Sequence, residues 1–127
     1  MPVSASIVKT ILFADDDDDN SELLMELFAL LAYRAFRARN GKELLDLVEK
    51  HAPNLVILDV EMPVMDGNQT VQILRQDPRF REIPVLALTA TALQGDRELF
   101  QRQGFTDCMS KPFSIPALAR MLGKYLT

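Results

Sequence analysis

The feature that most constrains the fold of this chain is a set of short apolar runs that alternate with segments of helical periodicity. The clearest runs are Ile11–Ala14, Leu55–Leu58 and Pro84–Leu88. Apolar residues in an unbroken row of this length are typical of strands that are covered on both faces. Strands of this kind separated by helices predict a parallel sheet with helices packed on both sides.

Weaker patterns complete the order of elements. Tyr33–Arg39 alternates apolar and basic side chains, which suits a half-exposed edge strand, and Asp107–Ser110 forms a last short strand. The helices are indicated by Leu24, Leu27, Phe28 and Leu31; by Leu44, Leu45 and Val48; by Val71, Ile73 and Leu74; by the segment Leu93–Gln103; and by Ile115, Leu118, Ala119, Leu122 and Leu126. We therefore predict an α/β fold in which a strand followed by a helix occurs five times.

Local signals mark several helix boundaries. Asp18, Asp19 or Asn20 can cap the first helix, because short side chains with an oxygen accept hydrogen bonds from the free N–H groups there. Ser114 is expected to cap the last helix, and Gly104 to end the fourth.

Length and composition limit the class of protein. The chain has 127 residues, so we expect one domain over residues 1–127, with residues 1–6 as a short tail. A net charge of -4 argues against direct nucleic-acid binding or a membrane-surface protein, and no apolar run is long enough for membrane insertion. The single cysteine and single histidine exclude an internal disulfide and metal sites rich in these residues. Because neither a signal peptide nor a membrane-spanning run is readable, we expect a cytoplasmic protein.

Reactive side chains stand where the apolar runs end. Asp15 and Asp16 follow the first strand, Asp59 the third, Thr89 the fourth and Lys111 the fifth. In open α/β sheets, ligands bind outside the carboxyl ends of the strands, where the strand order reverses. With a strand order of 2-1-3-4-5, that point lies between the first and third strands. We therefore expect Asp15, Asp16 and Asp59 to converge there.

The residue types at this point indicate phosphoryl-transfer chemistry. Three carboxylates in one crevice repel one another, so either one is protonated or a cation compensates them. An open loop with few carboxylates suits Mg²⁺, which keeps several waters and is often shared with a phosphate. Lys111 adds an ammonium group, and Thr89 adds a hydroxyl that can bond a phosphoryl oxygen.

The acidic run also has an interpretation as a calcium-binding EF-hand loop. The residues with that spacing are Asp15, Asp17, Asp19 and Glu26. We reject this interpretation because the sixth position is Asn20 rather than glycine, and because a strand rather than a helix precedes the run.

The chain carries four motifs that resemble, in their order and spacing, those of response-regulator receiver domains of two-component signalling. They are Ile11–Asp16 (ILFADD), Leu58–Gly67 (LDVEMPVMDG), Ala87–Ala90 (ALTA) and Ser110–Phe113 (SKPF). The resemblance covers nearly the whole chain. It is chemotaxis-regulator-like, and the last two motifs are similar to those of receivers of hybrid histidine kinases. It implies a flavodoxin-like, doubly wound parallel sheet of five strands in the order 2-1-3-4-5.

The resemblance also implies roles for individual residues. Asp59 is then the phosphoacceptor, Lys111 bridges Asp59 and the phosphoryl group, and Thr89 turns inward on phosphorylation. Glu61 and Thr91 occupy positions that modulate the attack of water on the acyl phosphate.

A magnesium site is implied by the same motifs. Asp16 and Asp59 would ligate Mg²⁺ through their side chains, Glu61 through its backbone carbonyl, and Asp15 largely through water. The Lys111–Pro112 peptide bond is expected to be cis.

One position departs from the family pattern. Cys108 stands where an aromatic residue usually reports the phosphorylated state, and a small thiol cannot fill or vacate an aromatic pocket. We interpret Cys108 as a small buried hydrophobe at a modulating position. The departure leaves open an alternative function, a docking module that signals without phosphorylation.

The leading prediction is a phosphoacceptor signalling domain and not a classical enzyme. It would take a phosphoryl group from the phosphohistidine of a histidine kinase or histidine phosphotransfer protein, and lose it slowly by autodephosphorylation. A downstream effector is expected on the face built from the fourth helix, last strand and last helix, in a monomer or weak dimer. A phosphohydrolase acting on external substrates has little support, because the sequence offers no histidine base and no cap domain.

Overall fold

The computed structural model describes residues 8–90 and 94–126, in which strands and helices alternate along the chain. The elements are β1 (Thr10–Ala14), α1 (Asp18–Leu30), β2 (Arg34–Ala38), α2 (Gly41–Lys50), β3 (Leu55–Asp59), α3 (Gly67–Gln76), β4 (Val85–Thr89), α4 (Gln94–Gln103), β5 (Asp107–Ser110) and α5 (Ile115–Leu126). All neighbouring strands pair in parallel, in the order β2-β1-β3-β4-β5. The predicted fold class and strand order are thereby confirmed.

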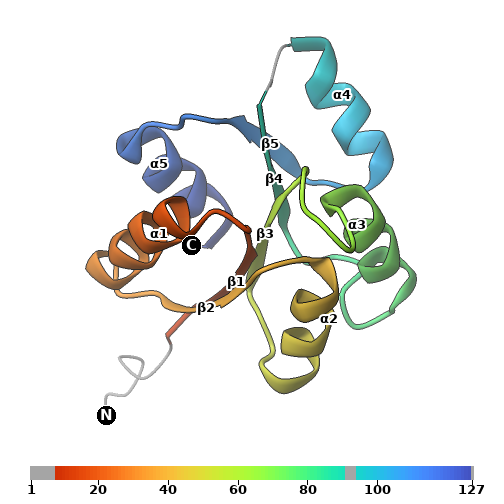
Figure 1. Cartoon of the computed structure of the whole chain (residues 1–127), viewed down its shortest axis with the longest axis horizontal. Coiled ribbons are helices and arrows are strands. Elements are labelled where there is room, and N and C mark those ends of the chain that lie inside the picture. Colours follow the sequence, from red (N-terminus) through yellow and green to blue (C-terminus); the bar gives the residue numbers. More distant parts are fainter. Residues whose placement is uncertain (1–7, 91–93, 127) are drawn as a thin grey trace.

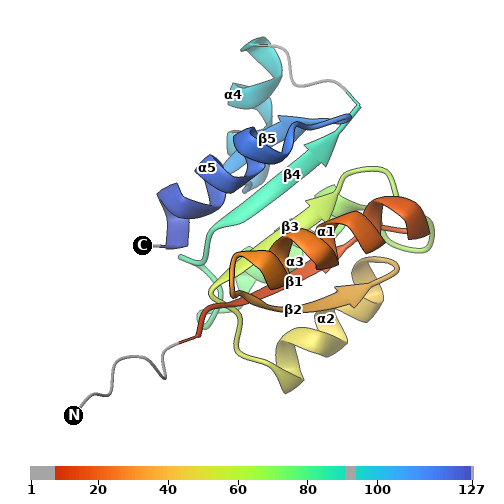
Figure 2. The same ribbon diagram turned by 90° about the vertical axis from the view of Figure 1, so that its left-hand side faces the viewer.

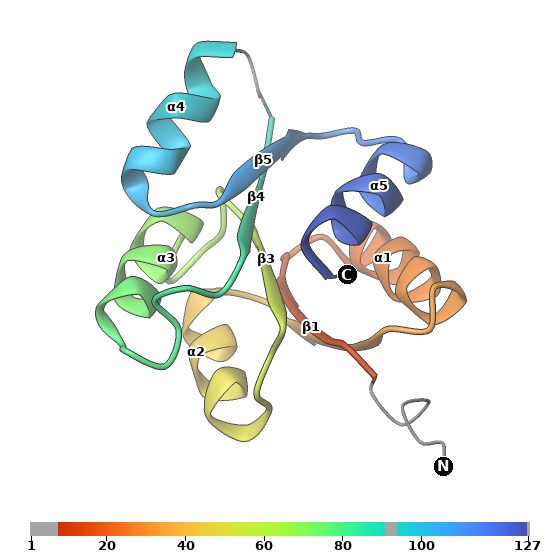
Figure 3. The ribbon, with the colours of Figure 1, turned by 180° about the vertical axis from the view of Figure 1, so that it is seen from behind.

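Helices cover both faces of the sheet. Helices α1 and α5 lie on one face, and α2, α3 and α4 lie on the other (Figures 1 and 3). The view from the side places α1 and α5 together in front of the strands (Figure 2). Because both faces are covered, the central strands β3 and β4 are buried along their whole length.

Alternation along the strands divides the core into two clusters. In β1, Ile11 and Phe13 pack with the buried faces of α1 and α5, whereas Leu12 and Ala14 pack with those of α2 and α3. Successive side chains of a strand point to opposite faces, so each strand supplies both clusters. This packing holds the carboxyl ends of the strands at one edge of the sheet.

The end of β1 and the end of β3 lie side by side at this edge, and the chain leaves them in opposite directions. From β1 it passes to α1 on one face, and from β3 it passes to α3 on the other (Figure 1). The crevice expected at such a point is therefore flanked by the segments that carry Asp15, Asp16 and Asp59.

Most expected helix boundaries are confirmed. The Ser114 hydroxyl accepts from the Ala117 backbone N–H at 3.1 Å, and Gly104 follows α4 with a left-handed φ of 115°. The expected cap of α1, at Asp18, Asp19 or Asn20, is wrong. The cap is Asp17, whose side chain accepts from the Asn20 N–H, because Asp15 Oδ1 accepts from the Asp17 N–H and turns the chain one position earlier.

Some expectations concern residues that the structure does not describe. The tail at residues 1–6, Thr91, and Leu93 as the expected start of the fourth helix all lie outside the described ranges. Within those ranges, every helix is too short or too polar to cross a bilayer.

Candidate functional site

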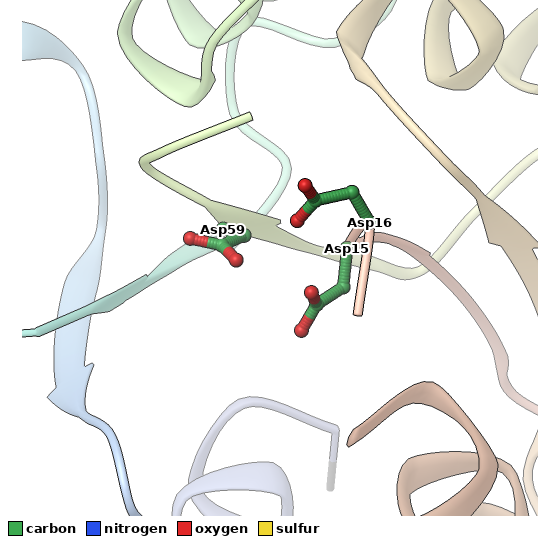
Figure 4. Close-up of side chains that lie close together, drawn as sticks. All are labelled: Asp15, Asp16 and Asp59. Carbon is green, nitrogen blue, oxygen red and sulfur yellow. The ribbon is translucent and has the colours of Figure 1, made fainter. Parts of the chain in front are cut away.

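Three carboxylates meet at the edge of the sheet between β1 and β3. Asp15, Asp16 and Asp59 each offer a carboxylate oxygen, and these oxygens lie within 4.8 Å of one another (Figure 4). Asp15 and Asp59 are buried, and Asp16 is exposed. The convergence expected from the strand-end pattern is present in the structure.

Asp59 is the last residue of β3, and the residue is only 3% exposed. Its Oδ1 accepts from the Glu61 backbone N–H at 3.0 Å, and its Oδ2 accepts from Lys111 Nζ at 2.5 Å. Burial raises the pKa of the Asp59 carboxyl above its ordinary value, and the charge of Asp15 adds to this rise. The hydrogen bonds from Lys111 and Glu61 oppose the rise without cancelling it.

Lys111 reaches the site from the end of β5. Its Nζ lies 2.5 Å from Asp59 Oδ2 and 3.9 Å from Asp15 Oδ2. Burial alone would lower the pKa of the ammonium, but the hydrogen bond to Asp59 and the charges of the nearby carboxylates raise it overall. The peptide bond from Lys111 to Pro112 is cis, as expected.

The carboxylate of Asp15 is held by its own turn. Its Oδ1 accepts from the Asp17 N–H at 3.0 Å, and its Oδ2 accepts from Asn20 Nδ2 at 2.5 Å. These two hydrogen bonds fix the orientation of the Asp15 carboxylate. Sequence reasoning did not assign Asn20 to the site, although its position in the first turn of α1 was a signal.

Two arginines contact the same turn: Arg37 in β2, and Arg39 directly after it. Arg37 donates to the Asp15 backbone carbonyl from Nε at 3.2 Å and from Nη2 at 2.9 Å, and to Asp18 Oδ1 from Nη1 at 2.8 Å. Arg39 donates to the same Asp18 oxygen at 3.1 Å. These contacts span 19 to 22 residues of sequence, so periodicity alone could not reveal them.

The loop after β3 is packed closely against Asp59. Asp66 caps α3 through a capping box with Gln69. A Cβ on Gly67 would meet the Asp59 carbonyl oxygen at 2.7 Å, so the approach of α3 requires glycine here. The capped helix therefore fixes the segment that begins with Asp59.

Two of the three carboxylates, Asp16 and Asp59, line an open cleft of about 290 Å³ together with Lys111. Its lining residues are Asp16, Asp17, Asp59, Glu61, Ala90 and Lys111. Thr89, the buried last residue of β4, lies at the same edge, and its carbonyl accepts from the Lys111 N–H at 2.7 Å. The structure thus brings the expected residues Glu61, Thr89 and Lys111 to the edge that carries the carboxylates.

Cys108 does not line this cleft. It lies in β5 opposite Ala87 of β4, is 2% exposed, and packs in the cluster that includes Phe100 and Phe105. Its interpretation as a small buried hydrophobe is confirmed.

The donor set fits a divalent cation. Three carboxylates face one ammonium group. Burial and, to a smaller extent, the charge of Asp15 raise the pKa of Asp59, and the hydrogen bond to Asp59 and the surrounding carboxylates raise the pKa of Lys111. Oxygen ligands in an open cleft are what Mg²⁺ prefers, and the cleft leaves room for the waters that it retains. Asp16, Asp59 and the Glu61 carbonyl are the groups available to hold it.

Comparisons with known proteins agree with the fold and identify the family. The family model of the response regulator receiver domain matches residues 11–123. The chain therefore belongs to the response-regulator receiver family of two-component signalling, as its motifs indicated. Receiver domains are regulatory rather than classical enzymes, bind Mg²⁺ at an acidic pocket, and have histidine kinases or phosphotransfer proteins as partners.

Individual relatives cover nearly the whole chain. The polar-differentiation response regulator DivK of Brucella anthropi is 35% identical over 118 residues, which are 93% of this chain and 96% of DivK. The chemotaxis response regulator CheY4 of Vibrio cholerae is 26% identical, with a TM-score of 0.89 over 94% of this chain and 100% of CheY4.

A third relative carries a metal. The receiver domain of the sensor histidine kinase PA1611 from Pseudomonas aeruginosa is 30% identical, with a TM-score of 0.84 over 94% of this chain and 98% of that one. Its crystal structure has a magnesium ion coordinated in the active-site cleft.

Proposed function

We propose that this chain accepts a phosphoryl group on Asp59 from the phosphohistidine of a histidine kinase or histidine phosphotransfer protein, and that the modification switches partner binding. The observation that carries the proposal is the environment of Asp59. Its buried carboxylate is 2.5 Å from the Lys111 ammonium and within 4.8 Å of two further carboxylates that suit Mg²⁺.

In the proposed reaction, a carboxylate oxygen of Asp59 attacks phosphorus and forms the acyl phosphate. The bond from phosphorus to the donor imidazole nitrogen breaks, and its electron pair remains on that nitrogen, which takes up a proton. Lys111 stabilises the negative charge on the phosphoryl oxygens. When bound, Mg²⁺ would supply further positive charge that stabilises the transferred group. Burial of Asp59 limits the access of competing groups.

Other residues receive narrower roles in the proposal. The Thr89 hydroxyl bonds a phosphoryl oxygen and moves inward. Glu61 and Thr91 modulate the slow hydrolysis of the acyl phosphate. We assign the effector surface to the α4–β5–α5 face, and we regard residues 1–127 as one receiver domain.

Titration with beryllofluoride and Mg²⁺ tests the proposal. Beryllofluoride mimics the phosphoryl group on a carboxylate, so the amide spectrum of the wild-type protein should shift around β3, β4 and β5. The matched control is Asp59→Asn, which keeps the side-chain shape and removes the nucleophile, and its spectrum should stay unchanged. Intact mass spectrometry after incubation with acetyl phosphate should find one added phosphoryl group in the wild type alone. A phosphoryl group on another residue would contradict the proposal.

The packing of Cys108 favours one alternative, a receiver-fold docking module that signals without phosphorylation. A small buried thiol stands at the position of the usual aromatic reporter, so that side chain has no counterpart here. Equal partner affinity of wild type and Asp59→Ala, with and without phosphodonor, would support the alternative. A difference that depends on the phosphodonor would support phosphorylation-dependent signalling.

A further inference from the structure

Arg37 lies outside the four motifs, yet it contacts the turn that carries two of the three carboxylates. It pairs in register with Phe13 on the sheet face that α1 covers, and its side chain is 20% exposed. We propose that Arg37 is a positioning residue for the metal site, which holds the turn between β1 and α1 in the geometry that binds Mg²⁺. The inference rests on the proposed function, because it requires a magnesium site.

The contacts of Asp15 show how Arg37 acts. The Asp15 backbone N–H donates to the Ala38 carbonyl at 3.1 Å, so β2 already holds one side of this residue. The Asp15 carbonyl accepts two hydrogen bonds from Arg37 and a longer one of 3.4 Å from the Ser21 hydroxyl. Backbone groups on both sides of Asp15 are therefore fixed, and this residue cannot rotate relative to β2.

The same anchorage determines where Asp16 points. The Asp15 carbonyl belongs to the peptide plane that joins Asp15 to Asp16, so fixing it also fixes the direction in which the Asp16 chain leaves. Asp16 is exposed, so packing restrains its carboxylate little. The remaining Arg37 nitrogen, Nη1, donates to the Asp18 carboxylate at the start of α1. This hydrogen bond anchors the other end of the turn.

Arginine suits this role because its planar fork has several donors in fixed directions. One guanidinium group bridges a carbonyl and a carboxylate here, which a lysine ammonium on a flexible stem does not do with the same geometry.

Charge and geometry make opposite predictions for this residue. A cation beside an acidic site repels Mg²⁺, so its removal would tighten Mg²⁺ binding if charge alone mattered. If Arg37 positions the turn, its removal weakens binding, because partners that orient ligands from outside commonly contribute 10-fold or more to metal affinity. The sign of the change therefore separates the two effects.

Arg39 provides the matched control. It donates to the same oxygen of Asp18 and has the same charge, but its hydrogen bonds do not include the Asp15 carbonyl. We would measure the Mg²⁺ dissociation constant of the full chain by calorimetry for wild type, Arg37→Gln, Arg37→Lys and Arg39→Gln. The expected result is about a tenfold rise for Arg37→Gln, a similar rise for Arg37→Lys, and no rise for Arg39→Gln.

A Mg²⁺ dissociation constant for Arg37→Gln that is equal to or lower than that of wild type would overturn the inference. So would full rescue by Arg37→Lys, since the planar fork of donors would then not be needed. Urea unfolding and amide spectra show whether each variant is folded. If Arg37→Gln does not fold, Arg37→Lys, which keeps the aliphatic stem, takes its place in the Mg²⁺-binding test. If wild type binds no Mg²⁺, the proposed function fails with the inference. If all four proteins bind Mg²⁺ equally, only the inference fails.

Discussion

Arg75 in α3 makes contacts that predict a large loss of stability when it is replaced. Its guanidinium group donates to three backbone carbonyls at short distance, those of Gly104 at 2.8 Å, Phe80 at 2.9 Å and Ile83 at 2.7 Å. It also donates to the Thr106 hydroxyl at 3.2 Å. One side chain thus joins α3 to the segment before β4 and the segment before β5.

The magnitude follows from the three short contacts. Burial lowers the pKa of Arg75, but an arginine remains charged at neutral pH, so these are charge-assisted bonds. Allowing about 1 kcal/mol for each, because the group is only half-buried, Arg75→Met should lose about 3 kcal/mol. The unfolding entropy of 127 residues is about 0.27 kcal/mol per kelvin, so the melting temperature should fall by about 11 °C.

Urea unfolding followed by circular dichroism measures this loss. Arg75→Lys keeps the charge but not the fork, and it should lose most of the same stability. Arg81→Met, at an exposed arginine in the segment before β4, is the control and should change stability by less than about 0.5 kcal/mol. A loss below about 1 kcal/mol for Arg75→Met, or wild-type stability for Arg75→Lys, would refute the reasoning.

Three further predictions concern backbone strain, a tyrosine hydroxyl and the metal. Val64 has a left-handed φ of 67° and is 78% exposed, so Val64→Asn should stabilise the fold by about 1 kcal/mol in urea unfolding, and lower stability would contradict the strain. Burial and the hydrogen bond to Asp107 raise the pKa of Tyr125 to about 12. The folded state therefore holds the Tyr125 proton more tightly than the unfolded state does. The resulting contribution to the free energy of unfolding is complete below a pH of about 10 and is lost as the pH rises through about 12. Ultraviolet titration should detect a tyrosine that ionises at this high pH, and Tyr125→Phe should abolish that transition. Mg²⁺ at ten times its dissociation constant should stabilise wild type by about 1.4 kcal/mol. Chelation should remove this gain, and Asp59→Asn should show little of it; an equal gain in that variant would place the ion elsewhere.

The residues that line the site were predictable because their positions follow from the strands. Asp59 and Lys111 each follow an apolar run or short strand, and a polar residue there must lie at the edge of the sheet. Both faces of β3 and β4 are covered by helices, which is why their apolar runs are continuous and easy to recognise. The motifs then indicated the family, which supplied the strand order and the roles.

Local sequence signals predicted helix caps less reliably where adjacent residues can all act as the cap. Asp17 caps α1 in place of the three residues beside it, because the carboxylate of Asp15 holds its N–H. The pattern of acidic residues does not show which of several adjacent oxygens accepts a given bond, since each has the chemistry of a cap.

The amino-acid sequence alone determined the alternation of strands and helices and the side chains that collect where the strands end. Only the tertiary structure decided what holds them there. Arg37 and Arg75 look like ordinary solvated arginines in the sequence, and their partners lie as many as 22 and 31 residues away. Their roles arise from the directions of carbonyl groups that meet only after the chain has folded, and side-chain patterning carries no record of those directions.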